Sequence, residues 1–238
     1  MNMTRFFDRI RGSLYGGSLK QITVDNINKI VSYWAQAYSD NVEQQLAYIL
    51  ATVLAEVGRD MNPVRETFAR SDEQARYRLR HKAYAQSTPP YGHAYYGRGY
   101  VQLTWIYNYQ RQEDKLNIPL VKFPDMALAT EIAVQILVGG MMDGDFNGSG
   151  RGLEFYINRK RVDFVHARRT VNVLNRASEI AGYAEAFWDA IEYAKEERLM
   201  DPSVGVWDAE RAVAALMLPS VEHLEAQREF FVGAKTDD

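Results

Sequence analysis

The feature that most constrains the fold is an apolar stripe at helical spacing between Asp40 and Gly58. The stripe consists of Leu46, Ile49, Leu50, Val53, Leu54 and Val57. Residues spaced by three and four lie on one face of an α-helix. Asp40 followed by Glu43 fits a capping box, and Gly58 with the later Pro63 supplies stop signals. The pattern predicts a long helix with one buried face.

Similar periodicity recurs along the chain, so the expected class is mainly α. It predicts helices over 23–37, 125–142 and 163–194, the last with a break within 172–178. An amphipathic piece over 207–231, interrupted at Pro219, follows a connection containing Pro and Gly. Strand candidates are confined to 100–103 and 154–157. We expect a main domain over 1–200 and a helical C-terminal extension over 201–238 that is free to contact a partner.

Composition excludes several classes of protein. The net charge of −3 gives no general attraction to nucleic acid or anionic lipid. The chain has no cysteine, and its four histidines include no pair at metal-ligand spacing, so we expect no disulfide, no metal and no other cofactor. No stretch approaches 18 apolar residues and the N-terminus lacks the apolar run of a signal peptide. We therefore expect no membrane insertion and a cytoplasmic start.

Two glutamates are the candidate catalytic groups. Glu56 lies on the apolar stripe, where a carboxylate must find a partner or take up a proton. Glu66 follows ten residues later, beyond Pro63, so the chain can turn back and place the two acids across a groove. Such a pair suits hydrolysis of a glycosidic bond, in which one acid protonates the leaving oxygen and the other activates water. A salt bridge to a nearby arginine is the alternative for Glu56, and Asp60 is a rival second acid.

The stretch YYGRGYVQLTW over 95–105 is the second candidate element. Its glycines lack the spacing of a phosphate-binding loop. Period-two alternation favours an extended segment that presents Tyr100, Gln102 and Thr104 on one face and Val101, Leu103 and Trp105 towards the core. Gln102, Thr104 and Asn108 can hydrogen-bond water or a sugar, and Tyr95, Tyr96, Trp105 and Tyr107 offer flat faces. An aromatic-rich core hairpin is the alternative.

Three blocks resemble glycoside hydrolase family 19, which includes chitinases and phage lysozymes, in the compact form of phage and prophage lytic enzymes. The blocks are LAYILATVLAEVGRDMNPVRE, GHAYYGRGYVQLTWIYNY and VHARRTVNVLNRASEIAGYAEAF, and the opening FFDRIRGSLYGGSLKQITVDNIN is also similar to the start of such phage proteins. The resemblance covers roughly residues 5–198. It implies a lysozyme-like α-helical bundle in which a small hairpin or extended segment lines a substrate cleft.

Carried over residue by residue, the resemblance implies Glu56 as general acid, Glu66 as general base and Thr104 as a holder of the attacking water. It also implies sugar contacts for Gln102 and Asn108 and adds Arg168 and Asn172 behind the base. With Tyr96, Trp105 and Tyr107 as flat faces and Arg98 between its two glycines, these are the predicted substrate-binding residues. For Arg98 two roles stay open, pairing with a catalytic carboxylate or tying its loop to a helix end. A basic helix face is the alternative for Arg168 and Arg169. The family's inverting mechanism predicts carboxyl groups roughly 6.5–9.5 Å apart.

One departure from the family pattern is plain. The family usually has His before the acid and Thr after it, whereas this chain has Ala55 and Val57. The change removes a hydrogen-bonding neighbour of the acid. It keeps open a catalytically weak wall-binding or virion structural protein as an alternative.

The preferred function is hydrolysis of the β-1,4 bond between N-acetylmuramic acid and N-acetylglucosamine in peptidoglycan, with chitin as the alternative substrate. The protein would stay in an infected bacterium until it reaches the cell wall, or be carried in the virion, and the extension could bind a phage partner. Nucleic-acid binding through ARRTVNVLNR is disfavoured, because the run is short and the chain is acidic overall.

Overall fold

The computed structural model describes residues 1–196, which belong to a compact unit running to Asp201. This part of the chain is mainly helical with two small antiparallel hairpins, which confirms the fold class predicted from the sequence. The predicted extension over 201–238 lies outside the described residues. Within 1–196, no helix is both long and apolar enough to cross a membrane.

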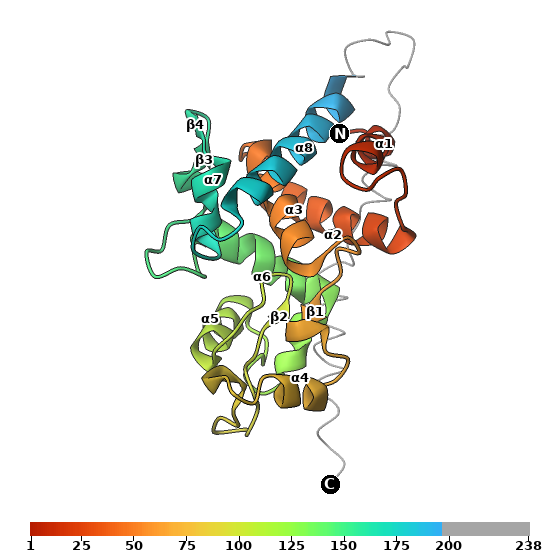
Figure 1. Ribbon diagram of the computed structural model, residues 1–238. Helices are drawn as coiled ribbons and strands as arrows, with labels where there is room; N and C mark the ends of the chain where they lie inside the picture. Colours follow the sequence, from red (N-terminus) through yellow and green to blue (C-terminus); the bar gives the residue numbers. More distant parts are fainter. Residues whose placement is uncertain (197–238) are drawn as a thin grey trace. The chain divides into compact units, whose positions relative to one another are not determined.

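Five helices enclose the main core (Figure 1). They are α1 (Met3–Ser13), α2 (Gln21–Ala37), α3 (Glu43–Val57), α6 (Thr130–Asp143) and α8 (Ala177–Glu196). Helix α3 packs most extensively against α8, α8 also covers α1, and α2 lies on α6. Most side chains of α3 are buried, so its burial exceeds the one-faced pattern read from the sequence. The site described below is built at the C-terminal end of this central helix.

The ends of α3 differ in how well the sequence predicts them. The helix begins at Glu43 with Val42 at the N-cap and no side-chain cap hydrogen bond, so the predicted capping box at Asp40 is wrong. The other end is as expected. Gly58 has φ +83 and donates its backbone N–H to the Leu54 carbonyl. A positive φ is costly for residues with a Cβ, so the glycine fixes where the helix stops.

The other predicted helices are present but interrupted. The 125–142 helix divides into η3 (Pro124–Leu128) and α6, with extended backbone at Ala129 between them. The 163–194 helix divides into α7 (Phe164–Ala167), η5 (Arg168–Thr170) and α8, and the irregular residues 171–176 confirm its predicted break. Helix α4 (Asp72–Arg78) occupies a stretch of mixed charge between the two glutamate-bearing segments and η3. Helices α1 and α5 (Ile106–Leu116) were not predicted.

The first hairpin is formed by β1 (Val64–Arg65) and β2 (Arg98–Gly99), with Val64 opposite Gly99 and Arg65 opposite Arg98. The predicted extended segment over 100–103 is wrong. The chain reverses there, and Arg98 and Leu103 exchange backbone hydrogen bonds. Positive φ values of +81 at Gly99 and +55 at Gln102 make this reversal. Packing also requires Gly99, because a Cβ would come 2.8 Å from the Ala127 carbonyl of η3.

The second hairpin pairs β3 (Ile157–Asn158) with β4 (Arg161–Val162). The strand predicted over 154–157 overlaps it only at Ile157, since η4 (Leu153–Phe155) occupies the residues before. A smaller apolar cluster lies beside the main core, under α4, and consists of Ala69, Ala75, Leu79, Ala85, Ala94 and Tyr96. In Figure 1, α4, α5 and the β1–β2 hairpin gather on the same side of α6.

Candidate active site

Glu56 stands in the last turn of α3 beside a buried arginine. One carboxylate oxygen, Oε1, lies 2.7 Å from Nη1 of Arg168. The contact is an ion pair without hydrogen-bond alignment. The Arg168 side chain is 5% exposed and the Glu56 side chain 20%. Nε of Arg168 donates to the Asn175 carbonyl at 3.2 Å. Arg168 therefore does not belong to a basic helix face, whereas Arg169 is exposed.

Arg176 holds the helix end that carries Glu56, and sequence reasoning missed it. Its Nη1 donates to the Ala55 carbonyl at 2.9 Å, while Nε and Nη2 donate to the carboxylate of Glu179. Tyr183 donates a further hydrogen bond to Glu179. The pKa of Arg176 is raised, mainly by its hydrogen bond with Glu179 and to a lesser degree by the charge of Glu56. An arginine thus anchors the backbone of Ala55, the residue directly before Glu56.

Glu66 follows β1 directly, and both of its carboxylate oxygens accept hydrogen bonds. The Tyr84 hydroxyl donates to Oε1 at 2.7 Å and the Gly97 N–H donates to Oε2 at 2.8 Å. The Glu66 N–H in turn donates to the Gly97 carbonyl at 2.7 Å. Gly97 leaves room for this arrangement, since a Cβ there would lie 2.8 Å from Oε1 of Gln102 and 3.2 Å from Oε2 of Glu66. The hairpin therefore fixes the carboxylate.

An aromatic patch adjoins Glu66 and consists of the partly buried Tyr84 and the exposed Trp105 and Tyr107. The Tyr84 and Trp105 rings meet edge to face at 5.5 Å, and Trp105 stacks on Tyr107 at 6.0 Å. Trp105 is 40% exposed and Tyr107 60%. Burial, followed by the neighbouring Glu66, raises the pKa of Tyr84, so its hydroxyl keeps the proton that it donates. Flat faces open to solvent beside a carboxylate suit a sugar chain.

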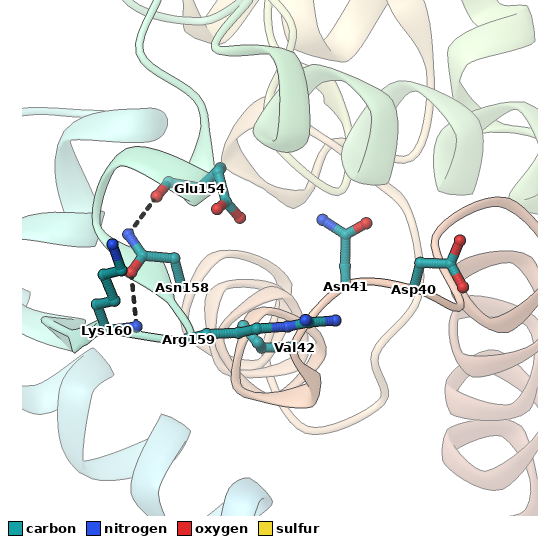
Figure 2. A pocket seen from close by; sticks show the side chains of 7 residues that line it. All are labelled: Asp40, Asn41, Val42, Glu154, Asn158, Arg159 and Lys160. Carbon is teal, nitrogen blue, oxygen red and sulfur yellow. Dashed lines mark hydrogen bonds between the residues drawn. The ribbon is translucent and has the colours of Figure 1, made fainter.

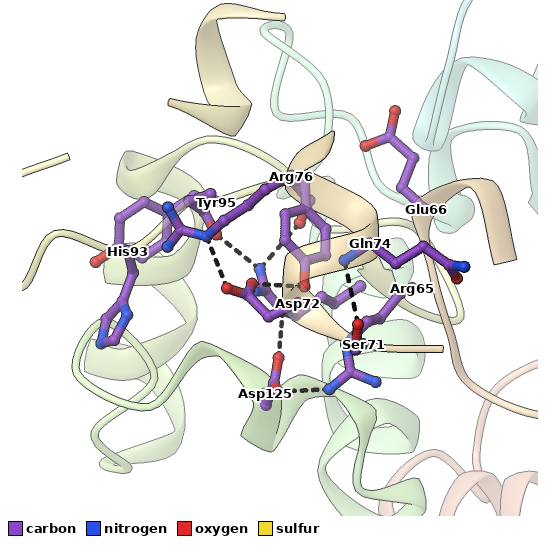
Figure 3. A network of polar contacts seen from close by, with 12 residues as sticks. Arg65, Glu66, Ser71, Asp72, Gln74, Arg76, His93, Tyr95 and Asp125 are labelled. Carbon is purple, nitrogen blue, oxygen red and sulfur yellow. Dashed lines mark hydrogen bonds and ion pairs between the residues drawn. The ribbon is translucent and has the colours of Figure 1, made fainter. Parts of the chain in front are cut away.

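Two of the residues predicted to contact substrate, Tyr96 and Arg98, are enclosed, with 0% and 1% of their surface exposed. The Arg98 guanidinium stacks on the Tyr96 ring, 3.7 Å from its centroid. It donates to Asp125 at 2.7 Å and to Asp72 at 3.2 Å, within a polar network that also holds Arg65 and Arg76 (Figure 3). Arg98 therefore ties its segment to α4 and η3 and pairs with neither Glu56 nor Glu66.

The three polar side chains predicted to bind water or a sugar, Gln102, Thr104 and Asn108, are only partly available to a ligand. Nε2 of Gln102 donates to the carbonyls of Val64 and Gly99, so its amide protons brace the hairpin. Asn108 donates to the Thr104 carbonyl at 2.8 Å. Thr104 is partly exposed. The alternation predicted for 100–105 fails at its two ends, because Tyr100 is buried and Trp105 is exposed. Between them Val101 and Leu103 are buried and Gln102 and Thr104 partly exposed, as predicted.

The remaining sequence candidates are also placed by the structure. Asn172 is exposed in the irregular segment before α8, and its side-chain oxygen accepts from the Val173 N–H. Asp60, the rival second acid, is half exposed and pairs with Lys20 at 2.7 Å. Asp60 thus has a structural partner at the surface.

A separate polar pocket lies at the opposite end of α3 (Figure 2). It has a volume of ≈ 570 Å³ and is lined by Asp40, Asn41, Val42, Glu154, Asn158, Arg159 and Lys160. Helix α3 is about 22 Å long at 1.5 Å per residue, so the pocket is remote from Glu56. Within 1–196, no three Asp, Glu or His side chains cluster in a way that could hold a metal ion.

Comparisons with known proteins give only distant structural similarities. No family model matches the chain and no curated protein matches it. Chitinase C from Streptomyces griseus HUT6037 is 22% identical with a TM-score of 0.49, covering 80% of this chain and 75% of that one. A glutamate-to-glutamine mutant of chitinase C is 18% identical with a TM-score of 0.47, covering 80% of this chain and 90% of that one. A bacterial family 19 chitinase is 21% identical with a TM-score of 0.40, covering 81% of this chain and 93% of that one. Similarities this distant do not decide chemistry.

Removing the Tyr84 hydroxyl tests how Glu66 is held. The Tyr84→Phe variant is expected to lower kcat for glycan hydrolysis about tenfold, because one oxygen of Glu66 loses its donor and the carboxylate turns more freely. Tyr91→Phe is the matched control, since Tyr91 is an exposed tyrosine seven residues further along the chain. Initial rates on a soluble N-acetylglucosamine oligomer measure both variants. Equal rates for wild type and Tyr84→Phe would remove Tyr84 from the site.

Proposed function

We propose that this protein is a glycoside hydrolase that cleaves β-1,4 bonds in an N-acetylated glycan by an inverting, two-carboxylate mechanism. The observation that carries the proposal is the contrast between the two glutamates. Glu56 is paired with a buried arginine at a helix end, and Glu66 is held by two donors beside the aromatic patch. Two carboxyl groups in different surroundings are what acid and base roles require.

In this mechanism Glu66 is the general base. Its donors, Tyr84 and Gly97, fix the direction of the carboxylate lone pairs towards an attacking water, which Thr104 helps to hold. Glu56 is the general acid and protonates the leaving oxygen. Once it has given up the proton it carries a negative charge, which Arg168 stabilises. Inversion requires room for a water, so the carboxyl groups are expected roughly 6.5–9.5 Å apart.

The charge around Glu66 favours peptidoglycan over chitin. Among the exposed residues of 64–100, the stretch that contains Glu66, four are basic and one is acidic, although the whole chain has a net charge of −3. The basic residues are Arg70, Arg78, Arg80 and Lys82, and the acidic one is Glu73. Peptidoglycan carries carboxylates on its lactyl and peptide groups, whereas chitin is uncharged. A locally cationic wall attracts the charged polymer. Cleavage between N-acetylmuramic acid and N-acetylglucosamine is therefore the preferred reaction.

The aromatic patch predicts a specific effect on substrate binding. In Trp105→Ala, KM is expected to rise about tenfold or more, because stacking against an exposed indole is worth about 1–3 kcal/mol in comparable ring contacts. The kcat value should change far less, since stacking on a sugar ring contributes to binding equally in the ground state and the transition state. Phe155→Ala serves as control, because Phe155 is a similarly exposed ring on η4. Michaelis–Menten kinetics on a soluble oligomer separate KM from kcat. A fall in kcat alone would contradict a stacking role.

The stereochemistry of the first product tests the mechanism. We expect ¹H NMR of a freshly started digest of a β-linked N-acetylglucosamine oligomer to show the α-anomer first, as inversion at the anomeric carbon requires. Early accumulation of the β-anomer would show retention and overturn the assignment of Glu66 as base. Binding of the oligomer without any product would favour a wall-binding protein.

A further inference from the structure

The peptide unit between Tyr96 and Gly97 is held at both ends. Its carbonyl accepts from the Tyr109 hydroxyl at 2.9 Å and from Nη1 of Arg98 at 3.3 Å. Its N–H donates to Oε2 of Glu66 at 2.8 Å. The carbonyl and the N–H belong to one planar group. Any donor that fixes the carbonyl therefore also fixes the direction in which the N–H meets Glu66.

The donors on the carbonyl side are fully enclosed. Tyr109 is 0% exposed and Arg98 1%. Tyr109 accepts from Nη1 of Arg98 at 3.1 Å, so its own proton goes to the Tyr96 carbonyl. Burial raises the pKa of Tyr109 to about 12 despite the opposing charge of Arg98, so the hydroxyl remains a donor. Hydrogen bonds in such a chain polarise one another when water is excluded.

We propose that Tyr109 and Arg98 are positioning residues for Glu66 and act through the Tyr96–Gly97 peptide. Their donation to the carbonyl makes the Gly97 N–H a stronger and better aimed donor, which holds Oε2 while Oε1 stays with Tyr84. This role rests on the proposed function of Glu66 as general base. It also explains why Arg98 is buried next to the site without contacting either catalytic glutamate.

A pair of conservative variants tests the proposal. Tyr109→Phe removes the hydroxyl that fixes the peptide. Tyr95→Phe is the matched control, because Tyr95 is equally buried, packs 5.2 Å from the Tyr109 ring and donates its hydroxyl proton to the Val121 carbonyl. Tyr109→Phe loses two buried hydrogen bonds and Tyr95→Phe loses one, so Tm is expected to fall in both variants and further in Tyr109→Phe. Only Tyr109→Phe should lower kcat, by about tenfold with KM within about twofold.

A second readout does not depend on activity. In ¹H–¹⁵N NMR spectra, the Gly97 amide resonance should move upfield in Tyr109→Phe and stay in place in Tyr95→Phe. If it does so while the wild type cleaves neither an N-acetylglucosamine oligomer nor purified peptidoglycan, the proposed function fails and the coupling stands. An unmoved Gly97 resonance in Tyr109→Phe, or an equal loss of kcat in both variants, would overturn the positioning role.

Discussion

Replacing Glu56 with glutamine is expected to lower the rate of glycan hydrolysis by about 10²–10⁴-fold, the usual contribution of a general acid. Glutamine keeps the size of the side chain but has no carboxylic proton to give to the leaving oxygen. Glu56 is partly exposed at the end of α3, where a substrate can reach it. The release of soluble reducing ends from purified cell walls measures the effect.

The control for this variant is Asp60→Asn, which changes a nearby acid that is paired with Lys20 at the surface. Its rate should stay within about twofold of wild type, since an exposed ion pair contributes little. Glu56→Gln also leaves the buried Arg168 without its anion, so a lower Tm is expected. Both variants must therefore be assayed well below their Tm. Equal clearing by wild type and Glu56→Gln would contradict the assignment of the acid.

The largest expected effect on stability comes from Arg98→Met. Its free energy of unfolding should fall by about 2–4 kcal/mol, because two buried carbonyls lose a donor while the two carboxylates left behind are half exposed. The change deletes two ion pairs, with Asp72 and Asp125, and donors to the Ala94 and Tyr96 carbonyls. Urea unfolding at neutral pH measures the loss. Arg76→Met is the control, because Arg76 binds the same Asp72 from a more exposed position.

The difference in stability between wild type and Arg98→Met is expected to depend on pH. Burial would raise the pKa of Asp125, but the charges and hydrogen bonds of Arg98 and Arg65 outweigh it, and the pKa is lowered. The stability from this carboxylate is therefore present above the unfolded value of about 3.9 and is lost as the pH falls through the lower folded value. Acidification below about pH 4 should thus cost wild type more than Arg98→Met. Equal acid sensitivity in the two proteins would contradict this.

The helical framework was largely predictable because burial leaves a periodic trace in sequence. The stripe in α3 predicted the helix, and it also predicted that Glu56 would need a partner, which proved to be Arg168. Pro63 indicated that the chain would turn before Glu66, and Glu66 does begin a new segment after β1. The distance between the two carboxyl groups stays a prediction.

The details around the hairpin could not be read from the sequence. Gln102 and Trp105 adopt positive φ, which side chains with a Cβ rarely do. Tertiary contacts such as the bonds from the Gln102 amide to Val64 and Gly99 stabilise that backbone. The resulting turn reverses the faces that simple alternation predicts. Tyr100 and Trp105 therefore lie on the opposite faces from those that alternation predicts, since an aromatic residue in a core and one in a binding surface look alike in sequence.

The partners of Glu66 and Arg98 were missed for a related reason. Tyr84 lies in the short 3-10 helix η2 (Ala83–Ala85), whose sequence has no period, and nothing marks its hydroxyl as a donor to Glu66. Asp72 and Asp125 lie 26 and 27 positions from Arg98. Only the folded backbone brings these groups together, so a local motif cannot reveal them.

The most direct test of the account is mass spectrometry of the soluble fragments that the full chain releases from purified peptidoglycan after borohydride reduction. We expect wild type to release fragments with a reduced N-acetylmuramic acid end, and Glu56→Gln and Glu66→Gln to release almost none. Fragments ending in reduced N-acetylglucosamine would identify a different bond. No fragments from the wild type, or equal amounts from the glutamine variants, would contradict a two-carboxylate glycoside hydrolase.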